Sequence, residues 1–247
     1  MSDNFDKLMN SKISASTEKK AAPPPPKPKR SKAKRALLWI VIVLCLLVLL
    51  VCGTAVWGFF ASCLTGNSDT FSTNAALFGK VYFPRLTVPI SNVLVALARF
   101  GIQMLPVLAM VFYYTAAGVL HPVWRDWLLL PLVLLQLGML GMGFGILFSS
   151  LTTKYRDLSV LIKFGTGLWM YATPVVYPLS ELHLGKIMTF VRLNPVTMPV
   201  ELFRRALFGV GTVEPGCLWL SVGVTAAVAL LGVVLFSRVE RTFMDTI

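Results

Sequence analysis

Charge is almost absent from the long hydrophobic runs of this 247-residue chain. Charged residues make up 14% of the sequence and hydrophobic residues 56%, and no charged residue lies between Arg35 and Asp69. The run 36–61 alone exceeds the roughly 20 apolar residues that cross a bilayer as a helix. A soluble domain of this size does not have such a composition. None of the runs alternates like a barrel strand, so the sequence predicts an all-α, polytopic helical membrane protein.

The residue patterns of catalytic and metal sites are also missing. No carboxylate lies inside a predicted span, and the sequence contains no GxxxxGK[ST] phosphate-binding loop. The four cysteines show no CxxC spacing, and His121 and His183 are isolated from other ligands. We therefore expect no metal, no cofactor and no catalytic activity. The glycine-rich stretch "GMGFG" at 141–145 is interpreted as a site of close helix packing, because it lies within a span and no lysine follows it.

Positive charge is abundant, with a net charge of +12, but it is unevenly placed. Residues 1–35 hold ten Lys and Arg in a proline-rich stretch, which predicts a disordered basic tail. The other basic residues flank hydrophobic runs, where they interact with anionic lipid. This placement argues against nucleic-acid binding.

The hydrophobic runs predict five full spans, near 36–61, 88–118, 127–151, 158–178 and 216–237. A short interfacial helix is expected before Pro84, over "AALFGKVYFPR". A further amphipathic helix is expected in "NPVTMPVELFRRALFG", because Glu201, Arg204 and Arg205 fall at i, i+3 and i+4. We expect this second helix to lie at the membrane interface or to dip partly into it.

Four ordered blocks carry a resemblance to a known family. They are "WGFFASCLTGNSDTFSTNAALFGKVYFPRLTVPIS" (57–91), "LTTKYRDL" (151–158), "TPVVYPLSEL…NPVTMPVELFRRALFG" (173–209) and "FSRVERTFMDTI" (236–247). Together they resemble the permeases of type-two ABC exporters, in the branch that exports O-antigen, capsule or teichoic-acid polymers. The resemblance covers about three quarters of the chain. It implies a homodimeric permease, multi-pass in the cytoplasmic (inner) membrane of a bacterium, bound to two copies of a separate cytoplasmic ATP-binding subunit.

The resemblance assigns the interfacial helix as a coupling helix that docks on the ATPase, and it places "KYRDL" near the same partner. The residues implied in coupling are Leu77, Phe78, Lys80, Tyr82, Phe83, Arg85, Tyr155, Arg156 and Asp157. Aromatic residues and arginine are favoured at the centres of protein interfaces. The alternatives are a helix held only by lipid headgroups and a loop that is basic only because it flanks spans. Residues 177–195 resemble the family's non-cytoplasmic re-entrant helices, with a plain surface loop as the alternative.

Four residues are candidates for the substrate path. Arg99 lies near the centre of its span, where a charge is costly and usually faces protein or water. It could attract the phosphate of a lipid-linked glycan, or it could pair with helix-end carbonyls in the dimer. The aromatic candidates could stack on sugar rings or belong to an interfacial belt; they are Trp169, Tyr171 and Tyr177.

The resemblance begins within the first hydrophobic run, so we divide the chain into a basic tail (1–35), a first span without family character (36–61) and a permease core (62–247). The predicted function is ATP-driven export of a lipid-linked polysaccharide. The alternatives are a drug or small-lipid exporter of the same fold, and a non-transporting anchor or truncated or fused relic. The basic tail predicts a cytoplasmic N-terminus, whereas five spans and a cytoplasmic coupling helix require an external one. We expect the tail to stay cytoplasmic and the first run to be strained, either inserted as a shallow hairpin or spanning in a chain whose downstream part is partly misoriented. Either arrangement predicts weak or absent transport.

Overall fold

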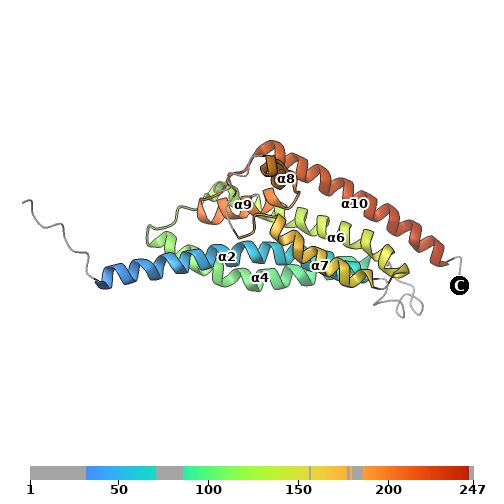
Figure 1. The fold of residues 1–247 in the computed structure, drawn as a ribbon, viewed down its shortest axis with the longest axis horizontal. Helices are drawn as coiled ribbons and strands as arrows, with labels where there is room; N and C mark the ends of the chain where they lie inside the picture. The colour runs from blue at the N-terminus through green and yellow to red at the C-terminus, as the bar shows by residue number, and fades with distance from the viewer. Residues whose placement is uncertain (1–31, 71–85, 156, 177–178, 180–185, 245–247) are drawn as a thin grey trace, which may run out of the picture. The chain divides into compact units, whose positions relative to one another are not determined.

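The computed structural model describes residues 32–70, 86–155, 157–176, 179 and 186–244 (Figure 1). The chain divides into two compact units, Met1–Ile42 and Val43–Ile247. Among the described residues of the first unit there is only the beginning of helix α2 (Lys32–Ser68). All other elements belong to the second unit, and every regular element among the described residues is a helix. The predicted all-α class is confirmed.

Four helices contain apolar stretches long enough to cross a membrane. They are Leu50–Ser68 within α2, α4 (Thr87–Ala116), Leu130–Thr152 within α6 (Leu130–Lys154), and Pro215–Leu235 within α10 (Pro215–Met244). The span predicted at 158–178 is shorter than expected, because helix α7 ends at Ala172 (Leu158–Ala172). Its 15 residues rise about 22 Å, less than the roughly 30 Å of the hydrocarbon core. The chain is therefore a multi-pass membrane protein with four long helices and one shorter apolar helix among its described residues.

The first hydrophobic run forms one continuous helix of 37 residues in α2. A hairpin needs a turn in which the helical backbone is interrupted, and α2 has none. The predicted shallow hairpin in this run is therefore wrong. The predicted division between the first span and the permease core, near residue 61, stays a prediction.

Glycines of α6 allow neighbouring helices to approach closely, which confirms the packing interpretation of "GMGFG". A β-carbon added at Gly141 would lie 2.7 Å from the Cys63 β-carbon of α2. One added at Gly143 would lie 3.0 Å from Val228 of α10. Membrane helices gain little from the hydrophobic effect when they associate, so their contacts are usually made by small residues that allow close packing. The two faces of this glycine stretch thus hold α6 between α2 and α10, and Figure 1 shows α6 and α10 side by side.

Helices α2 and α4 run antiparallel. Phe59 of α2 meets Phe100 of α4 with ring centroids 5.7 Å apart, and Asn92, two turns earlier in α4, reaches Gly66, two turns later in α2. Four helices meet at this end of the bundle, because α4, α6 and α7 each contact the end of α2 there. The contacts come from the beginning of α4, the end of α6 and the beginning of α7. We call this the coupling end. The segment 71–85, which holds the predicted coupling helix, connects α2 to α4 at this end and lies outside the described residues.

Three short helices occupy the opposite end, which we call the α9 end. They are α5 (Trp124–Trp127), α8 (Lys186–Leu193) and α9 (Thr197–Phe208). Gly209 ends α9 with a φ of 72°, a left-handed conformation that glycine adopts without steric cost. Almost every side chain of α9 is buried, so this helix forms the core of its end.

Candidate substrate path and its closed end

A buried ion pair dominates the α9 end. Glu201 and Arg204, one turn apart on α9, form a salt bridge with exposed fractions of 0% and 3%. Arg204 also donates from Nη2 to the carbonyl oxygens of Pro174, at 3.1 Å, and Val175, at 2.9 Å. Glu201 accepts backbone N–H bonds from Leu179 (3.1 Å) and Thr212 (3.2 Å). A buried ion pair is tolerated when its remaining donors and acceptors are bonded in this way.

The pair therefore fastens two irregular segments to α9, one after α7 and one before α10. Burial raises the pKa of Glu201, while the Arg204 guanidinium and the two backbone donors act in the opposite direction. Buried backbone groups require hydrogen-bond partners. This arrangement supplies them for the carbonyl groups of Pro174 and Val175 and for the N–H groups of Leu179 and Thr212.

A second ion pair holds α9 to α5. Arg205 Nε lies 2.5 Å from Asp126 Oδ2, and the indole N–H of Trp127 donates to the Ala206 carbonyl oxygen at 2.8 Å. The Val123 N–H donates to the same carbonyl at 3.1 Å. The segment between α4 and α6 is thus attached to α9 by one ion pair and two hydrogen bonds.

The predicted amphipathic helix is confirmed as a helix, but its surroundings differ from the prediction. An interfacial helix would expose its charged face, whereas Glu201 and Arg204 are fully enclosed by protein. Their partners are backbone groups from distant segments, which spacing within α9 cannot reveal. The sequence analysis did not single out either residue as a site, although a glutamate and an arginine one turn apart were visible as a potential pair.

The four substrate-path candidates lie in different environments. Trp169 is half-buried in an aromatic cluster, with ring centroids 5.3 Å from Phe60 and 5.6 Å from Phe144. Tyr171, two residues later, is 77% exposed on the other face of α7. Tyr177 lies outside the described residues. Trp169 therefore packs α7 against α2 and α6, whereas Tyr171, like Phe164 of the same helix, has an exposed ring.

Arg99 is exposed in the middle of α4. It lies 12 residues, about 18 Å, from the first residue of the helix and 17 residues, about 26 Å, from the last. Among the described residues it has no hydrogen-bond or ion-pair partner. A cation at this depth requires a partner outside the described residues, or water.

The face of α4 that carries Arg99 borders an open strip of α2. Arg99 follows Asn92 by seven residues, so both lie on the same edge of α4, and Asn92 contacts α2 directly. The antiparallel register sets Arg99 level with Phe59. The neighbouring partly exposed residues of α2 are small, namely Gly58, Ala61, Ser62 and Thr65. A cationic side chain thus lies on the edge of α4 that borders small, partly exposed residues of α2.

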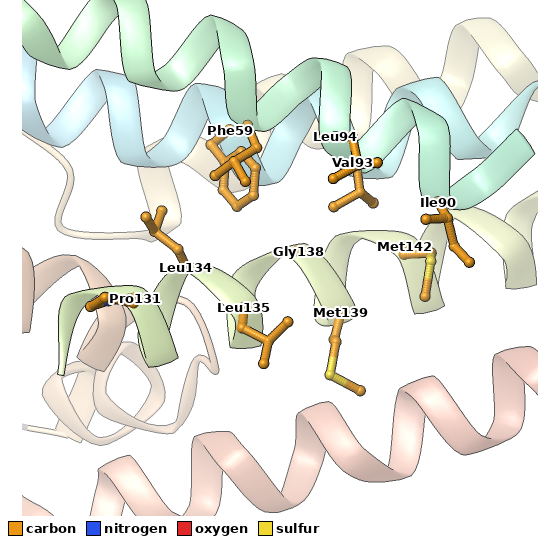
Figure 2. Close-up of a pocket in the computed structure, with 11 residues that line it drawn as sticks. Phe59, Ile90, Val93, Leu94, Pro131, Leu134, Leu135, Gly138, Met139 and Met142 are labelled. Atoms are coloured by element: carbon orange, nitrogen blue, oxygen red, sulfur yellow. The ribbon is translucent and has the colours of Figure 1, made fainter. Parts of the chain in front are cut away.

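A separate, entirely apolar groove lies on the opposite side of α4. It has a volume of about 430 Å³, and its walls are Ile90 and Leu94 of α4 and Leu134 and Met139 of α6. Figure 2 shows these side chains, with Phe59 of α2 at the base. The groove holds no charged residue, so it offers nothing to recognise a phosphate or a sugar.

The predicted coupling residues fall mainly outside the described part of the chain. This applies to Leu77, Phe78, Lys80, Tyr82, Phe83, Arg85 and Arg156. Tyr155 and Asp157 are exposed between α6 and α7, at the coupling end. These two positions are compatible with a partner on that end, and the assignment of the other residues stays a prediction.

Comparison with known proteins decides the family. Residues 80–208, just over half of the chain, match the family described as ABC-2 type transporter. The chain belongs to the ABC-2 transporter family. It is also 27% identical, over 198 residues, to an O-antigen export system permease protein RfbA of Klebsiella pneumoniae, covering 80% of this chain and 74% of that protein. A protein of the same name from Myxococcus xanthus is 28% identical over 132 residues, covering 53% of this chain and 48% of that protein.

The match to the ABC-2 family extends from the predicted coupling segment to the last residue of α9. It therefore includes Arg99, Trp169 and both ion pairs of α9 among the described residues. The predicted resemblance is confirmed. Membership in the ABC-2 family makes this chain a transport permease and implies that it pairs with an ATP-binding subunit.

Proposed function

We propose that this ABC-2 permease is the membrane subunit of an ATP-driven exporter that moves a lipid-linked polysaccharide across the bacterial cytoplasmic membrane. In this proposal it acts as a homodimer with two copies of a separate ATP-binding subunit on the cytoplasmic side. The observation that carries the proposal is the similarity to O-antigen export permeases, which extends over four fifths of the chain. The chain itself supplies the path through the membrane, and the partner supplies the energy.

The surroundings of Arg99 support this substrate class. A lipid-linked glycan carries phosphate next to its lipid, and phosphate is a natural partner for a guanidinium group that has no other counter-ion. Small, partly exposed residues of α2 border the edge of α4 that carries Arg99, and Tyr171 offers an exposed ring on α7. We assign Arg99 to the phosphate and Tyr171 to the sugar portion of the substrate.

The closed α9 end supports an exporter in a second way. A path through the membrane has to be sealed when no substrate passes, and α9 is anchored to three separate segments by charged and backbone hydrogen bonds. We propose that this helix closes the exit of the path in the resting state.

Reconstitution tests the proposal. The chain is purified with any ATP-binding subunit that accompanies it from its native membrane and is placed in vesicles containing a polyprenyl-pyrophosphate-linked oligosaccharide. We expect the glycan to stimulate ATP hydrolysis and to become accessible on the opposite face. Stimulation by small amphiphiles alone would instead assign a drug or small-lipid exporter. The absence of any ATP-binding partner would assign a non-transporting anchor.

A further inference from the structure

The last turn of α2 is capped by side chains from other helices. Asn92 of α4 donates to the Gly66 carbonyl oxygen at 3.0 Å and to Asn67 Oδ1 at 3.1 Å. Thr152 of α6 donates to the Ser68 carbonyl oxygen at 2.8 Å. The last four carbonyl groups of a helix have no partner within it. In α2, two of these carbonyl groups, those of Gly66 and Ser68, thus accept hydrogen bonds from side chains 25 or more positions away in the sequence.

The Thr152 contact with α2 is buried, the Asn92 contact with Asn67 is partly buried, and the Asn92 contact with Gly66 is exposed. Asn67 and Ser68 have exposed fractions of 0%, and Thr152 has 3%. Asn67 is also held by its own helix, since it donates to the Cys63 carbonyl oxygen at 2.8 Å. Water therefore does not compete for the hydrogen bond between Thr152 and the Ser68 carbonyl oxygen, and breaking it leaves a buried polar group unpaired.

An ion pair adds α7 to the same point. Lys163 Nζ lies 3.0 Å from Asp69 Oδ2, directly after the last residue of α2. The lysine side chain is 56% exposed and the aspartate side chain 23%. Four helices thus meet at Gly66–Asp69, and we call the contacts of Asn92, Thr152 and Lys163 with this turn the α2 clamp.

The position of the α2 clamp suggests what it does. Residues 71–85, the predicted docking segment, lie between Asp69 and the beginning of α4, so the clamp joins the two helix ends that carry this segment. We propose that the α2 clamp transmits displacement of residues 71–85 to α2, α4, α6 and α7 as one unit, and that Asn92, Thr152 and Lys163 are positioning residues for coupling. The inference rests on the proposed ATP-driven function and specifies how its energy reaches the membrane helices.

Without the clamp, the Ser68 carbonyl group would lose its donor Thr152, the Gly66 carbonyl group would keep only the 3.4 Å hydrogen bond from Thr70, and the final turn of α2 would have no attachment to α6 or α7 through these side chains. A push or pull on the segment would then unwind that turn before it moved the helices. Loosening the clamp should therefore separate ATP hydrolysis from transport, whereas a loss of general stability would lower both together.

The decisive variant is Thr152→Val, which keeps the size of the side chain and removes the hydroxyl group that bonds α2. The matched control is Thr166→Val in α7, where the buried hydroxyl bonds only Ile162 of its own helix, at 2.8 Å. Both are reconstituted with the ATP-binding subunit, and the glycan transported per ATP hydrolysed is measured. We expect Thr152→Val to lower this ratio about fivefold, the equilibrium change typical of one buried hydrogen bond, while its melting temperature is close to that of Thr166→Val and subunit binding stays near wild type. Thr166→Val should keep the wild-type ratio.

A charge exchange provides a second variant that does not depend on the folding of Thr152→Val. Lys163→Asp should lower the same ratio by like-charge repulsion, and Lys163→Asp combined with Asp69→Lys should restore it. Unchanged ratios in both Thr152→Val and Lys163→Asp would overturn the inference, as would an equal loss in Thr166→Val. If the wild-type complex shows no ATP-dependent glycan transport, the proposed function itself fails and this inference falls with it.

Discussion

Replacing Gly141 by alanine tests whether the glycines of α6 set the distance between α6 and α2. The added β-carbon would lie 2.7 Å from the Cys63 β-carbon and 2.9 Å from the Phe60 carbonyl oxygen. Ordinary contacts of this kind begin near 3.4 Å, so the helices have to separate by several tenths of an ångström. Overpacking of a well-packed contact costs about 1–3 kcal/mol. Because the Phe60 oxygen belongs to the backbone, a side-chain rotation cannot relieve the strain.

The control for this experiment is Gly223→Ala in α10, where an added β-carbon meets nothing within 4 Å. Alanine favours a helix over glycine by roughly 1 kcal/mol at either position. The difference in stability between the two variants therefore reports the cost of the steric contact at Gly141. The assay is thermal unfolding of the detergent-purified protein, followed by tryptophan fluorescence and by loss of the monodisperse species. We expect Gly141→Ala to unfold several degrees below Gly223→Ala. Equal unfolding temperatures would refute the reasoning that α6 and α2 are in close contact at this glycine.

Four further predictions follow from the site. Arg99→Gln should impair glycan export without changing the unfolding temperature, because Arg99 has no partner among the described residues; a variant that exports normally would remove its substrate role. Arg204→Met should destabilise the protein by about 3–5 kcal/mol, since it leaves a carboxylate buried and unpaired, and chemical denaturation measures the loss. Phe83→Ala with Arg85→Glu should abolish co-purification of the ATP-binding subunit but not membrane insertion, at a cost of about 2 kcal/mol or more for the aromatic anchor. If the tail is cytoplasmic, an N-terminal tag should be protected from protease added outside the cell. Labelling of a cysteine placed at Lys80 with a membrane-impermeant reagent then shows whether the coupling segment lies on the same side of the membrane as the tail.

The membrane helices could be predicted from the sequence because hydrophobic length depends on composition alone. The end of α7 was missed by about six residues, since the apolar run continues past it. Thr173 precedes Pro174, and the residue before a proline is disfavoured in a helix, so a local signal for the earlier end was present. The packing role of the 141–145 glycines was also predictable, because small residues within a span have few other uses.

The charges of α9 show what a single sequence does not reveal. Their spacing predicts a helix, but their burial depends on carbonyl groups of Pro174 and Val175 and on the N–H groups of Leu179 and Thr212. These groups have no side-chain signature, because any residue carries them. Asn92 and Thr152 were missed for the same reason, since each bonds a backbone oxygen of a distant helix.

The buried pair on α9 also dictates an order of biogenesis. Helix α9 carries two charges that the membrane would not accept unpaired, and its satisfied state requires Thr212, which is synthesised after α9 itself. Ser221 of α10 then donates to the Pro195 carbonyl oxygen at 2.5 Å, just before α9 begins. A nascent chain released before Thr212 would therefore keep the Glu201–Arg204 ion pair but lack one of the two backbone donors of the Glu201 carboxylate. The α9 end reaches its fully hydrogen-bonded state only after Thr212 and Ser221 have been synthesised.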